Sequence, residues 1–254
     1  MKLAAQLFTV RDFTNTDTEV RETLAKIRRI GYQAVQISAL RAYNVKNIVQ
    51  GLQENGLEVC VTHTPLGRIL GETEKVIDEH KLFGAKYVGL GYFYGNRIEE
   101  YSDLLDTLSP AIEKINNAGL KFLYHNHSHE FKNYGGIKPI DLLIEKSKTG
   151  CMGLLPDLHW LQKAGVSPEK FIRDHKGITP VVHFKDMRVP LDEYASSITE
   201  IFAGNMDYTG IYEACVETGV EWAAIEQDTC DGNPFDSLKK SFDNLQKHGL
   251  FIGK

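Results

Sequence analysis

The stretch GLKFLYHNH, residues 119–127, contains the pattern that decides the fold. A helical pattern ends at Gly119, where a residue without Cβ adopts a left-handed cap at the least cost. An apolar run, Lys121–His125, follows at once and has the composition of a short buried strand. The same order of helix, glycine, strand and polar strand end recurs along the chain, which indicates one repeated unit.

Eight apolar runs of strand length occur in the 254 residues. They are Leu3–Thr9, Ala34–Ser38, Leu57–Thr62, Tyr87–Gly91, Lys121–His125, Gly153–Asp157, Pro180–Phe184 and Trp222–Glu226. Stretches with apolar residues at helical spacing separate the runs. Seven of these stretches end at a clear glycine, and Gly150 is the candidate end of the fifth.

Strands separated by long helices pair in parallel, and eight such units close into a barrel. We therefore predict an α/β fold, a single (β/α)8 TIM barrel of eight parallel strands, with residues 1–254 as one domain. The alternative is a doubly wound open sheet, but no GxGxxG follows the first run, which disfavours it. The longest predicted loop, residues 187–207 after the seventh strand, is a candidate part of a lid.

The composition excludes several classes of protein. The net charge is −5, with 29 Lys and Arg against 34 Asp and Glu, which argues against nucleic acid or an anionic membrane as a partner. No apolar run is long enough to span a membrane and the start of the chain does not resemble a signal peptide, so the cytoplasm is the expected location. The four cysteines are widely spaced and are expected to be reduced.

Ionisable side chains lie at or just after the ends of five of the eight apolar runs. They are His63 at the third run, His125 and His127 at the fifth, Asp157 and His159 at the sixth, His183 and Lys185 at the seventh, and Glu226 at the eighth. Barrel enzymes place their chemistry at the carboxyl ends of the strands, so these groups are expected to meet at one mouth. Imidazole and carboxylate together suit Mn²⁺, Fe²⁺, Co²⁺ or Zn²⁺.

Each of these residues also has a structural interpretation. His63 or His159 alone is more often a hydrogen-bonded wall residue than a ligand, and a lone Asp157 would be a helix cap. His183 could be a core imidazole with both nitrogens paired. Glu226 is harder to explain in this way, because a carboxylate that follows a buried strand is costly without a cation or donors.

Five motifs together resemble one family. They are AAQLFTVRD (4–12), YHNHSHEF (124–131), PDLHWLQKAG (156–165), VVHFKDM (181–187) and EWAAIEQD (221–228). In this order, and spread over the whole chain, they resemble the xylose isomerase-like TIM barrels grouped as sugar phosphate isomerases/epimerases, relatives of ketose 3-epimerases and myo-inosose dehydratase. The motifs are specific for the superfamily and weak for the substrate.

The resemblance implies one divalent metal ion (Mn, Co, Fe, Zn or Mg) held by residues on the last four strands. Asp157, His183 and Glu226 match three of the family's four ligands. The fourth, a glutamate on the fifth strand in the family, aligns with His125 in this chain. Glu130 lies five residues further on and is the alternative oxygen ligand or a substrate contact.

The implied activity is proton transfer next to the carbonyl of a ketose or keto-sugar, in an isomerase or epimerase. His125 in place of a glutamate removes one of the family's two carboxylate bases and equally suits β-elimination, so a dehydratase or lyase acting on an inosose or a 3-keto-glycoside is the alternative. The candidate catalytic residues are Glu226, His125, Glu130 and Lys185. The candidate substrate-binding residues are His63, His127, His159 and Trp160.

Two of these residues have alternative structural roles. Lys185 could instead form a salt bridge to Asp186 or Asp157, and Trp160 could be core. An apurinic-site endonuclease and a non-catalytic sugar-binding barrel are less favoured than an enzyme that acts on a small sugar or cyclitol. The sequence leaves open the sugar, its phosphorylation, the metal and the oligomeric state, a homo-oligomer included.

Overall fold

The computed structural model of the chain describes residues 1–190 and 197–251. At its centre lies a sheet of eight strands in the order β6-β5-β4-β3-β2-β1-β10-β7. The strands are β1 (Lys2–Gln6), β2 (Ala34–Ile37), β3 (Glu58–His63), β4 (Tyr87–Leu90), β5 (Lys121–His125), β6 (Gly153–Leu155), β7 (Val181–Phe184) and β10 (Trp222–Ile225). All pairings within this sheet are parallel, as the helical spacing predicts.

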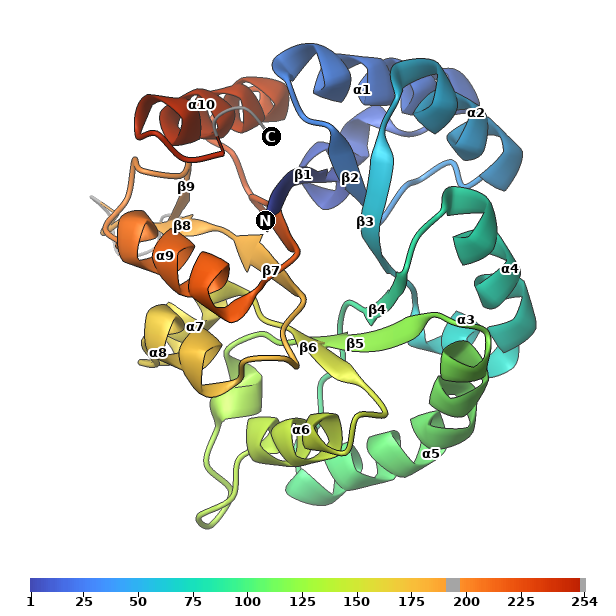
Figure 1. Ribbon diagram of the computed structural model, residues 1–254, viewed down its shortest axis with the longest axis vertical. Coiled ribbons are helices and arrows are strands. Elements are labelled where there is room, and N and C mark those ends of the chain that lie inside the picture. Colours follow the sequence, from blue (N-terminus) through green and yellow to red (C-terminus); the bar gives the residue numbers. More distant parts are fainter. Residues whose placement is uncertain (191–196, 252–254) are drawn as a thin grey trace.

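The two ends of this ladder, β6 and β7, meet each other at their carboxyl ends. Asp157 forms an isolated parallel bridge with His183, and the His183 N–H donates to the Pro156 carbonyl at 2.9 Å. The ring of strands is therefore nearly closed, with helices around it (Figure 1). The predicted (β/α)8 barrel is confirmed.

Helices connect successive strands on the outside of the ring. They are α1 (Asp17–Ile30), α2 (Val45–Asn55), α3 (Leu66–Gly71), α4 (Thr73–Phe83), α5 (Ile98–Asn117), α6 (Pro139–Lys148), α7 (Leu158–Lys163), α8 (Pro168–Asp174), α9 (Tyr208–Thr218) and α10 (Pro234–Lys247). Two short 3-10 helices, η1 (Leu7–Phe13) and η2 (His129–Phe131), follow β1 and β5. Gly150 has φ 84° just after α6, so it does end the fifth predicted helix.

Apolar residues fill two separate layers. A large layer lies between the strands and the helices. A small layer fills the barrel interior and consists of Ala4, Ala34, Cys60, Val61, Tyr87, Leu123, Leu155, Val181 and Ala224. The polar strand ends lie beyond this interior layer, so the packed interior forms the floor of the mouth.

Two predicted strands extend two or more residues past the carboxyl ends that the structure gives them, and the others agree to within one residue at each end. The first ends at Gln6, because the Gln6 side chain accepts a hydrogen bond from Phe8 N at 2.5 Å and starts η1. The sixth ends at Leu155, and Asp157 accepts from Trp160 N as the N-cap of α7. Gln6 is therefore the last residue of β1, and Asp157 lies two residues after β6 rather than inside it.

The long connection after β7 contains a small hairpin. β8 (Asp186–Met187) pairs antiparallel with β9 (Ile198–Thr199). Residues 191–196 of the predicted loop 187–207 lie outside the described residues, so its role as a lid stays a prediction.

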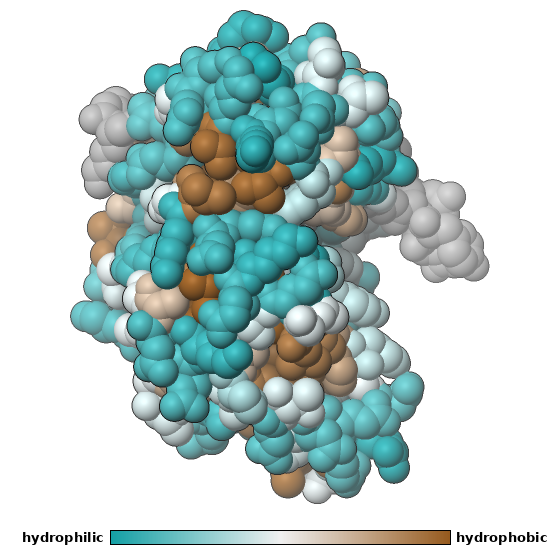
Figure 2. Space-filling view, turned by 90° about the vertical axis from the view of Figure 1, so that its right-hand side faces the viewer, coloured by the Kyte–Doolittle hydropathy of each residue, from teal (hydrophilic) through white to brown (hydrophobic). Residues whose placement is uncertain are grey.

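The outer surface is mostly hydrophilic. On the side that carries α2, α4 and α5, apolar patches are small and separated by polar side chains (Figure 2). In the part of the chain that the structure describes, no helix is long and apolar enough to cross a bilayer.

Candidate metal centre at the carboxyl ends of the strands

Four predicted ligands lie on four successive strands of the ring. His125 ends β5, Asp157 follows β6, His183 lies on β7 and Glu226 follows β10. Since the sheet order and the Asp157–His183 bridge place these strands side by side, the four side chains gather at one end of the barrel. All four are buried, with relative exposures of 4% or less.

Three of the four converge on one point. The facing ligand atoms of Asp157, His183 and Glu226 all lie within 4.8 Å of one another. His183 Nδ1 is 2.9 Å from Glu226 Oε2 and 3.7 Å from Asp157 Oδ2. These three atoms are buried and have no partner with hydrogen-bond geometry, and the two oxygens face the Lys185 ammonium as an ion pair. Buried carboxylates need such a compensating charge, so the arrangement indicates a site that holds a cation.

Two glutamines, on β1 and β2, orient the converging groups. His183 Nε2 donates to Gln36 Oε1 on β2 at 2.7 Å, which leaves the lone pair of Nδ1 directed at the carboxylates. Gln6 Nε2 on β1 donates to Glu226 Oε1 at 2.7 Å, which leaves Oε2 for the shared point. In both His183 and Glu226, a glutamine amide holds the atom that faces away from the shared point. Metal-binding side chains are typically oriented in this way.

The charges of the three groups are strongly perturbed. Burial raises the pKa of Asp157, but Lys185 and His183 lower it more, so the net pKa falls to about 2. Burial also raises the pKa of Glu226, and Lys185 and His183 together hold it well below its usual range. Burial lowers the pKa of His183, and the neighbouring carboxylates raise it to a net value above the ordinary one. Both carboxylates are therefore ionised at neutral pH.

Lys185 lies directly beside this cluster. Its Nζ is 2.8 Å from Asp157 Oδ2, 2.8 Å from Glu226 Oε2 and 2.9 Å from Asp228 Oδ2, and the side chain is 1% exposed. The predicted salt bridge to Asp157 is thus confirmed. The alternative prediction, a salt bridge between Lys185 and Asp186, is wrong. Asp186 instead accepts hydrogen bonds from the backbone N–H groups of Met187, Gly204 and Met206 in the loop that follows.

The fourth predicted ligand, His125, belongs to an adjoining set of rings. Nitrogen atoms of His63, His125 and His183 lie within 4.8 Å of one another, and the His125 and His183 ring centroids are 4.5 Å apart. His125 Nδ1 contacts the Leu155 carbonyl at 3.3 Å. Burial lowers the pKa of His63 to about 3 and that of His125 well below its ordinary value, so both rings are neutral.

Glu130, the alternative fourth ligand, lies in a different network. Its Oε1 accepts from Tyr124 Oη at 3.0 Å and lies 3.1 Å from His129 Nε2, and its Oε2 accepts from His127 N at 2.7 Å. His127, His129 and Glu130 form a separate group of potential ligand atoms. The structure therefore does not bring Glu130 to the cluster of Asp157, His183 and Glu226.

The predicted substrate-binding residues lie around the same mouth. The His127 ring is 5.5 Å from the Trp160 ring, and Trp160 is 4.9 Å from the His159 ring. Lys185 Nζ lies 5.5 Å from the centre of Trp160. On the other side, His63 borders two pockets of about 400 Å³ each, which share Ser38 and Thr64. Neither pocket is lined by Asp157, His183 or Glu226, and His63 links both pockets to the cluster, since its ring centroid lies 5.2 Å from that of His183.

Sequence reasoning missed three residues of the site: Gln6, Gln36 and Asp228. Both glutamines interrupt runs of apolar strand residues, AAQL and AVQI, and this polar residue inside a buried strand was the available signal. Asp228 stands in the motif EWAAIEQD, but nothing in the spacing ties it to Lys185, 43 residues away.

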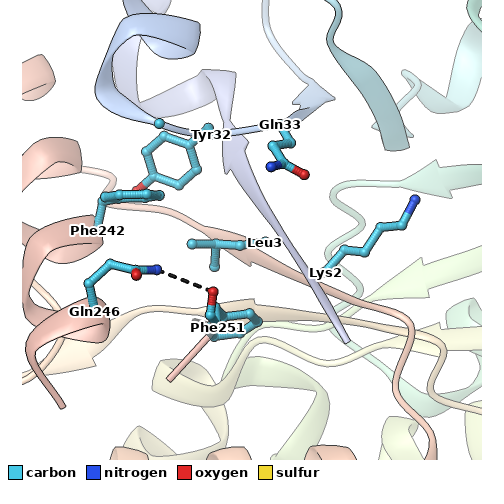
Figure 3. Close-up of a pocket in the computed structure, with 8 residues that line it drawn as sticks. Lys2, Leu3, Tyr32, Gln33, Phe242, Gln246 and Phe251 are labelled. Carbon is cyan, nitrogen blue, oxygen red and sulfur yellow. Dashed lines mark hydrogen bonds between the residues drawn. The ribbon is translucent and has the colours of Figure 1, made fainter. Parts of the chain in front are cut away.

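A further pocket, of about 430 Å³, lies at the other end of the barrel. Its lining includes Lys2 and Leu3 at the start of β1, with Tyr32, Phe242 and Phe251 around them (Figure 3). Barrel enzymes use the carboxyl ends of the strands, and this pocket holds no cluster of carboxylate and imidazole groups among the described residues. We therefore assign the candidate site to the opposite mouth.

The cluster fits a divalent cation. Two ionised carboxylates and one imidazole with a directed lone pair form a donor set that suits Zn²⁺, Mn²⁺, Fe²⁺ or Co²⁺. The evidence is that these three buried atoms share one space and have no hydrogen-bond partner, and that a cation, the Lys185 ammonium, already lies against the two oxygens.

Solved structures with the same fold come from several kinds of protein. A sugar phosphate isomerase/epimerase from Parabacteroides distasonis superimposes with a TM-score of 0.82 at 18% identity, over 97% of this chain and 98% of that one. A probable 3-DHS dehydratase, AsbF from Bacillus anthracis, gives 0.75 at 14% identity over 97% and 99%. The IOLI protein with a bound zinc atom gives 0.74 at 15% identity over 99% and 100%.

Because the sequence identities are below 20%, these structural matches establish the fold and not the activity. No protein with curated function matches the sequence. The model of one family, described as xylose isomerase-like TIM barrel, matches residues 24–248. This chain therefore belongs to the xylose isomerase-like TIM barrel family.

Proposed function

We propose that the protein is a divalent-metal-dependent sugar isomerase or epimerase, which moves a proton next to the carbonyl of a ketose or keto-sugar. The observation that carries the proposal is the convergence of Asp157 Oδ2, His183 Nδ1 and Glu226 Oε2 at the mouth of the barrel, all buried and without a hydrogen-bond partner. The isomerase/epimerase and the zinc-bound protein among the structural neighbours support it.

Asp157, His183 and Glu226 would hold the ion, and Gln36 and Gln6 would keep two of these ligands in place. When bound, a divalent ion polarises the substrate carbonyl and stabilises the negative charge that develops next to it. Glu226 is ionised and is therefore able to accept a proton. Its Oε2, the atom without a hydrogen-bond partner, is the atom that faces the shared space.

His125 is the candidate for the second proton-transfer group. Its ring is neutral and lies 4.5 Å from that of His183, on the β5 side of the cluster, whereas Glu226 lies on the β10 side. A substrate between them would meet a carboxylate on one side and a neutral imidazole on the other. His63, His127, His159 and Trp160 would surround the sugar ring.

A dehydratase or lyase is the second candidate, and the position of Glu130 favours it. Both Glu130 oxygens are engaged by Tyr124, His127 and His129, so Glu130 does not supply the second carboxylate base that a ketose epimerase uses. Elimination needs one group that takes a proton and another that protonates the departing oxygen, and imidazoles suit the second role. The neighbour described as a probable 3-DHS dehydratase has the same fold.

Deuterium oxide separates the two reactions. Purified protein loaded with Mn²⁺, Co²⁺ or Zn²⁺ is incubated in D₂O with ketoses, inososes and 3-keto-glycosides. Deuterium incorporated next to the carbonyl without loss of water supports the isomerase or epimerase, and an unsaturated product supports elimination. Glu221→Gln, at the opposite end of β10, is the matched control for Glu226→Gln. Absence of both products with every metal and substrate class would refute a catalytic role in this chemistry.

A further inference from the structure

Lys185 is a buried cation among the proposed ligands. Its ammonium is 2.8 Å from Asp157 Oδ2 and 2.8 Å from Glu226 Oε2, and the side chain is 1% exposed. A buried lysine loses hydration, which only close carboxylates compensate. Three of them surround it here, since Asp228 Oδ2 lies at 2.9 Å.

The two oxygens that hold the ammonium are the same two that face His183 Nδ1. Asp157 Oδ2 and Glu226 Oε2 lie 3.7 and 2.9 Å from that nitrogen. A divalent ion held by these three atoms would need both of these oxygens. An ammonium and a dication on the same pair of oxygens repel each other strongly in a buried site. The two cations therefore compete for one position.

Asp228 offers the ammonium another position. It follows β10 by three residues and its side chain is 31% exposed, so it lies on the outer side of the cluster. Asp228 is not among the groups of potential ligand atoms found in the described residues. An ammonium that kept only its Asp228 contact would leave both shared oxygens to the ion. Trp160, whose ring centre is 5.5 Å from Nζ, borders the same space.

We propose that Lys185 is a tethered cation that occupies the Asp157–Glu226 oxygens when no metal is bound and moves to Asp228 alone when a divalent ion enters. The inference builds on the proposed function but concerns the metal site itself. Lys185 keeps the two carboxylates together in the metal-free protein, and it lowers the affinity for the ion, so that the ion exchanges readily.

Metal titration of four proteins tests this competition. Co²⁺ binding is followed by ligand-field absorption and by calorimetry in wild type, Lys185→Met, Asp228→Asn and Lys170→Met. Lys170 is the matched control, because it is an exposed lysine on α8 paired with Asp174. We expect Lys185→Met to bind Co²⁺ about tenfold more tightly or better, Asp228→Asn to bind it more weakly, and Lys170→Met to bind as wild type does.

Thermal stability gives a readout that does not depend on turnover. Metal-free Lys185→Met should melt below wild type, because it leaves the carboxylates without a cation, and Co²⁺ should raise its Tm by more than that of wild type. Equal or weaker Co²⁺ binding by folded Lys185→Met would overturn the competition and leave the proposed function standing. Absence of Co²⁺ binding by both proteins would overturn both.

A measurement on wild type covers the case in which Lys185→Met does not fold. Protein labelled with ¹⁵N-lysine is titrated with Zn²⁺, and the Lys185 ammonium signal is assigned by its loss in Lys185→Arg. A change of that signal, saturating with the bound zinc, is the expected result. An unchanged Lys185 signal with zinc bound at the site overturns the proposal.

Discussion

Two buried glutamates near histidines lie at this mouth, and they differ in how their charge is satisfied. Glu130 receives hydrogen bonds from Tyr124 and from His127 N and has His129 beside it, so both of its oxygens are engaged. Glu226 has one oxygen held by Gln6, and the other faces the Lys185 ammonium at 2.8 Å and His183 Nδ1 at 2.9 Å without a hydrogen-bond partner. A carboxylate whose two oxygens accept from fixed donors stabilises the fold, whereas one whose oxygen faces a tethered cation and a ring nitrogen is available to a ligand.

Replacement of Glu226 should have the largest effect, and it should act on turnover. We expect Glu226→Gln to lower kcat/KM about a thousandfold, since a general base and a ligand are lost together. The unfolding free energy should fall as well, because the buried Lys185 loses one of its three carboxylate partners. Steady-state kinetics and thermal melts measure both. Glu221→Gln should leave turnover intact. A fully active Glu226→Gln would place the chemistry elsewhere.

Replacement of Glu130 should act on stability instead. Glu130→Gln introduces a donor where Tyr124 and His127 N already donate, so we expect a loss of about 3 kcal/mol in unfolding free energy. Urea titration measures this loss, with the exposed Glu145→Gln as control. Loss of turnover in Glu130→Gln without loss of stability would contradict the contrast between the two glutamates and restore Glu130 as a catalytic residue.

His80 extends the comparison to a histidine outside the site. Its Nδ1 contacts the Val76 carbonyl at 2.6 Å and its Nε2 contacts Thr62 Oγ1 at 2.7 Å, and burial lowers its pKa to about 4. Between pH 6.5, about the pKa of an unfolded histidine, and pH 4, His80 binds a proton in the unfolded chain but not in the folded one, so the free energy of unfolding falls as the pH falls. We expect the free energy of unfolding to fall by about 2 kcal/mol from this cause between pH 7 and pH 5.

Denaturant titrations at several pH values check the His80 prediction. His80→Gln should remove this part of the pH dependence, while His248→Gln, at an exposed position, should not. Identical pH profiles for wild type and His80→Gln would show that His80 does not carry the effect.

The smallest predicted effect concerns the orientation of His183. Gln36→Leu removes the acceptor of the His183 Nε2 proton, so the ring is free to turn, and we expect metal affinity to fall about tenfold. Calorimetric titration with Zn²⁺ measures it. Gln33→Leu, at a position outside the barrel mouth, is the control, and an unchanged affinity in Gln36→Leu would remove the glutamine from the site.

The fold was predictable because its signals are local. Glycines end helices and apolar runs mark strands, and these give eight units without knowledge of any contact. Their exact ends were not predictable, since β1 stops at Gln6 through a side-chain hydrogen bond and β6 stops before the Asp157 cap. Both depend on side-chain geometry that spacing does not encode.

The site was predictable in part. Position at strand ends and the family resemblance together selected Asp157, His183 and Glu226, and the structure brings these three together. It separates Glu130 from them and sets His125 in an adjoining set of rings, because neighbouring residues along a loop need not face the same space. The three-carboxylate environment of Lys185 depends on strands β6 and β10, which are distant in sequence.

The metal site lies where the barrel closes, between β6 and β7. β6 and β7 are the two free margins of the ladder, joined near their ends by the Asp157–His183 bridge and the His183 N–H bond to Pro156. Asp157 lies on the β6 side and His183 on the β7 side, so an ion bound by both would link these two strands. Removal of the ion by a chelator would then destabilise the barrel first at the junction of β6 and β7.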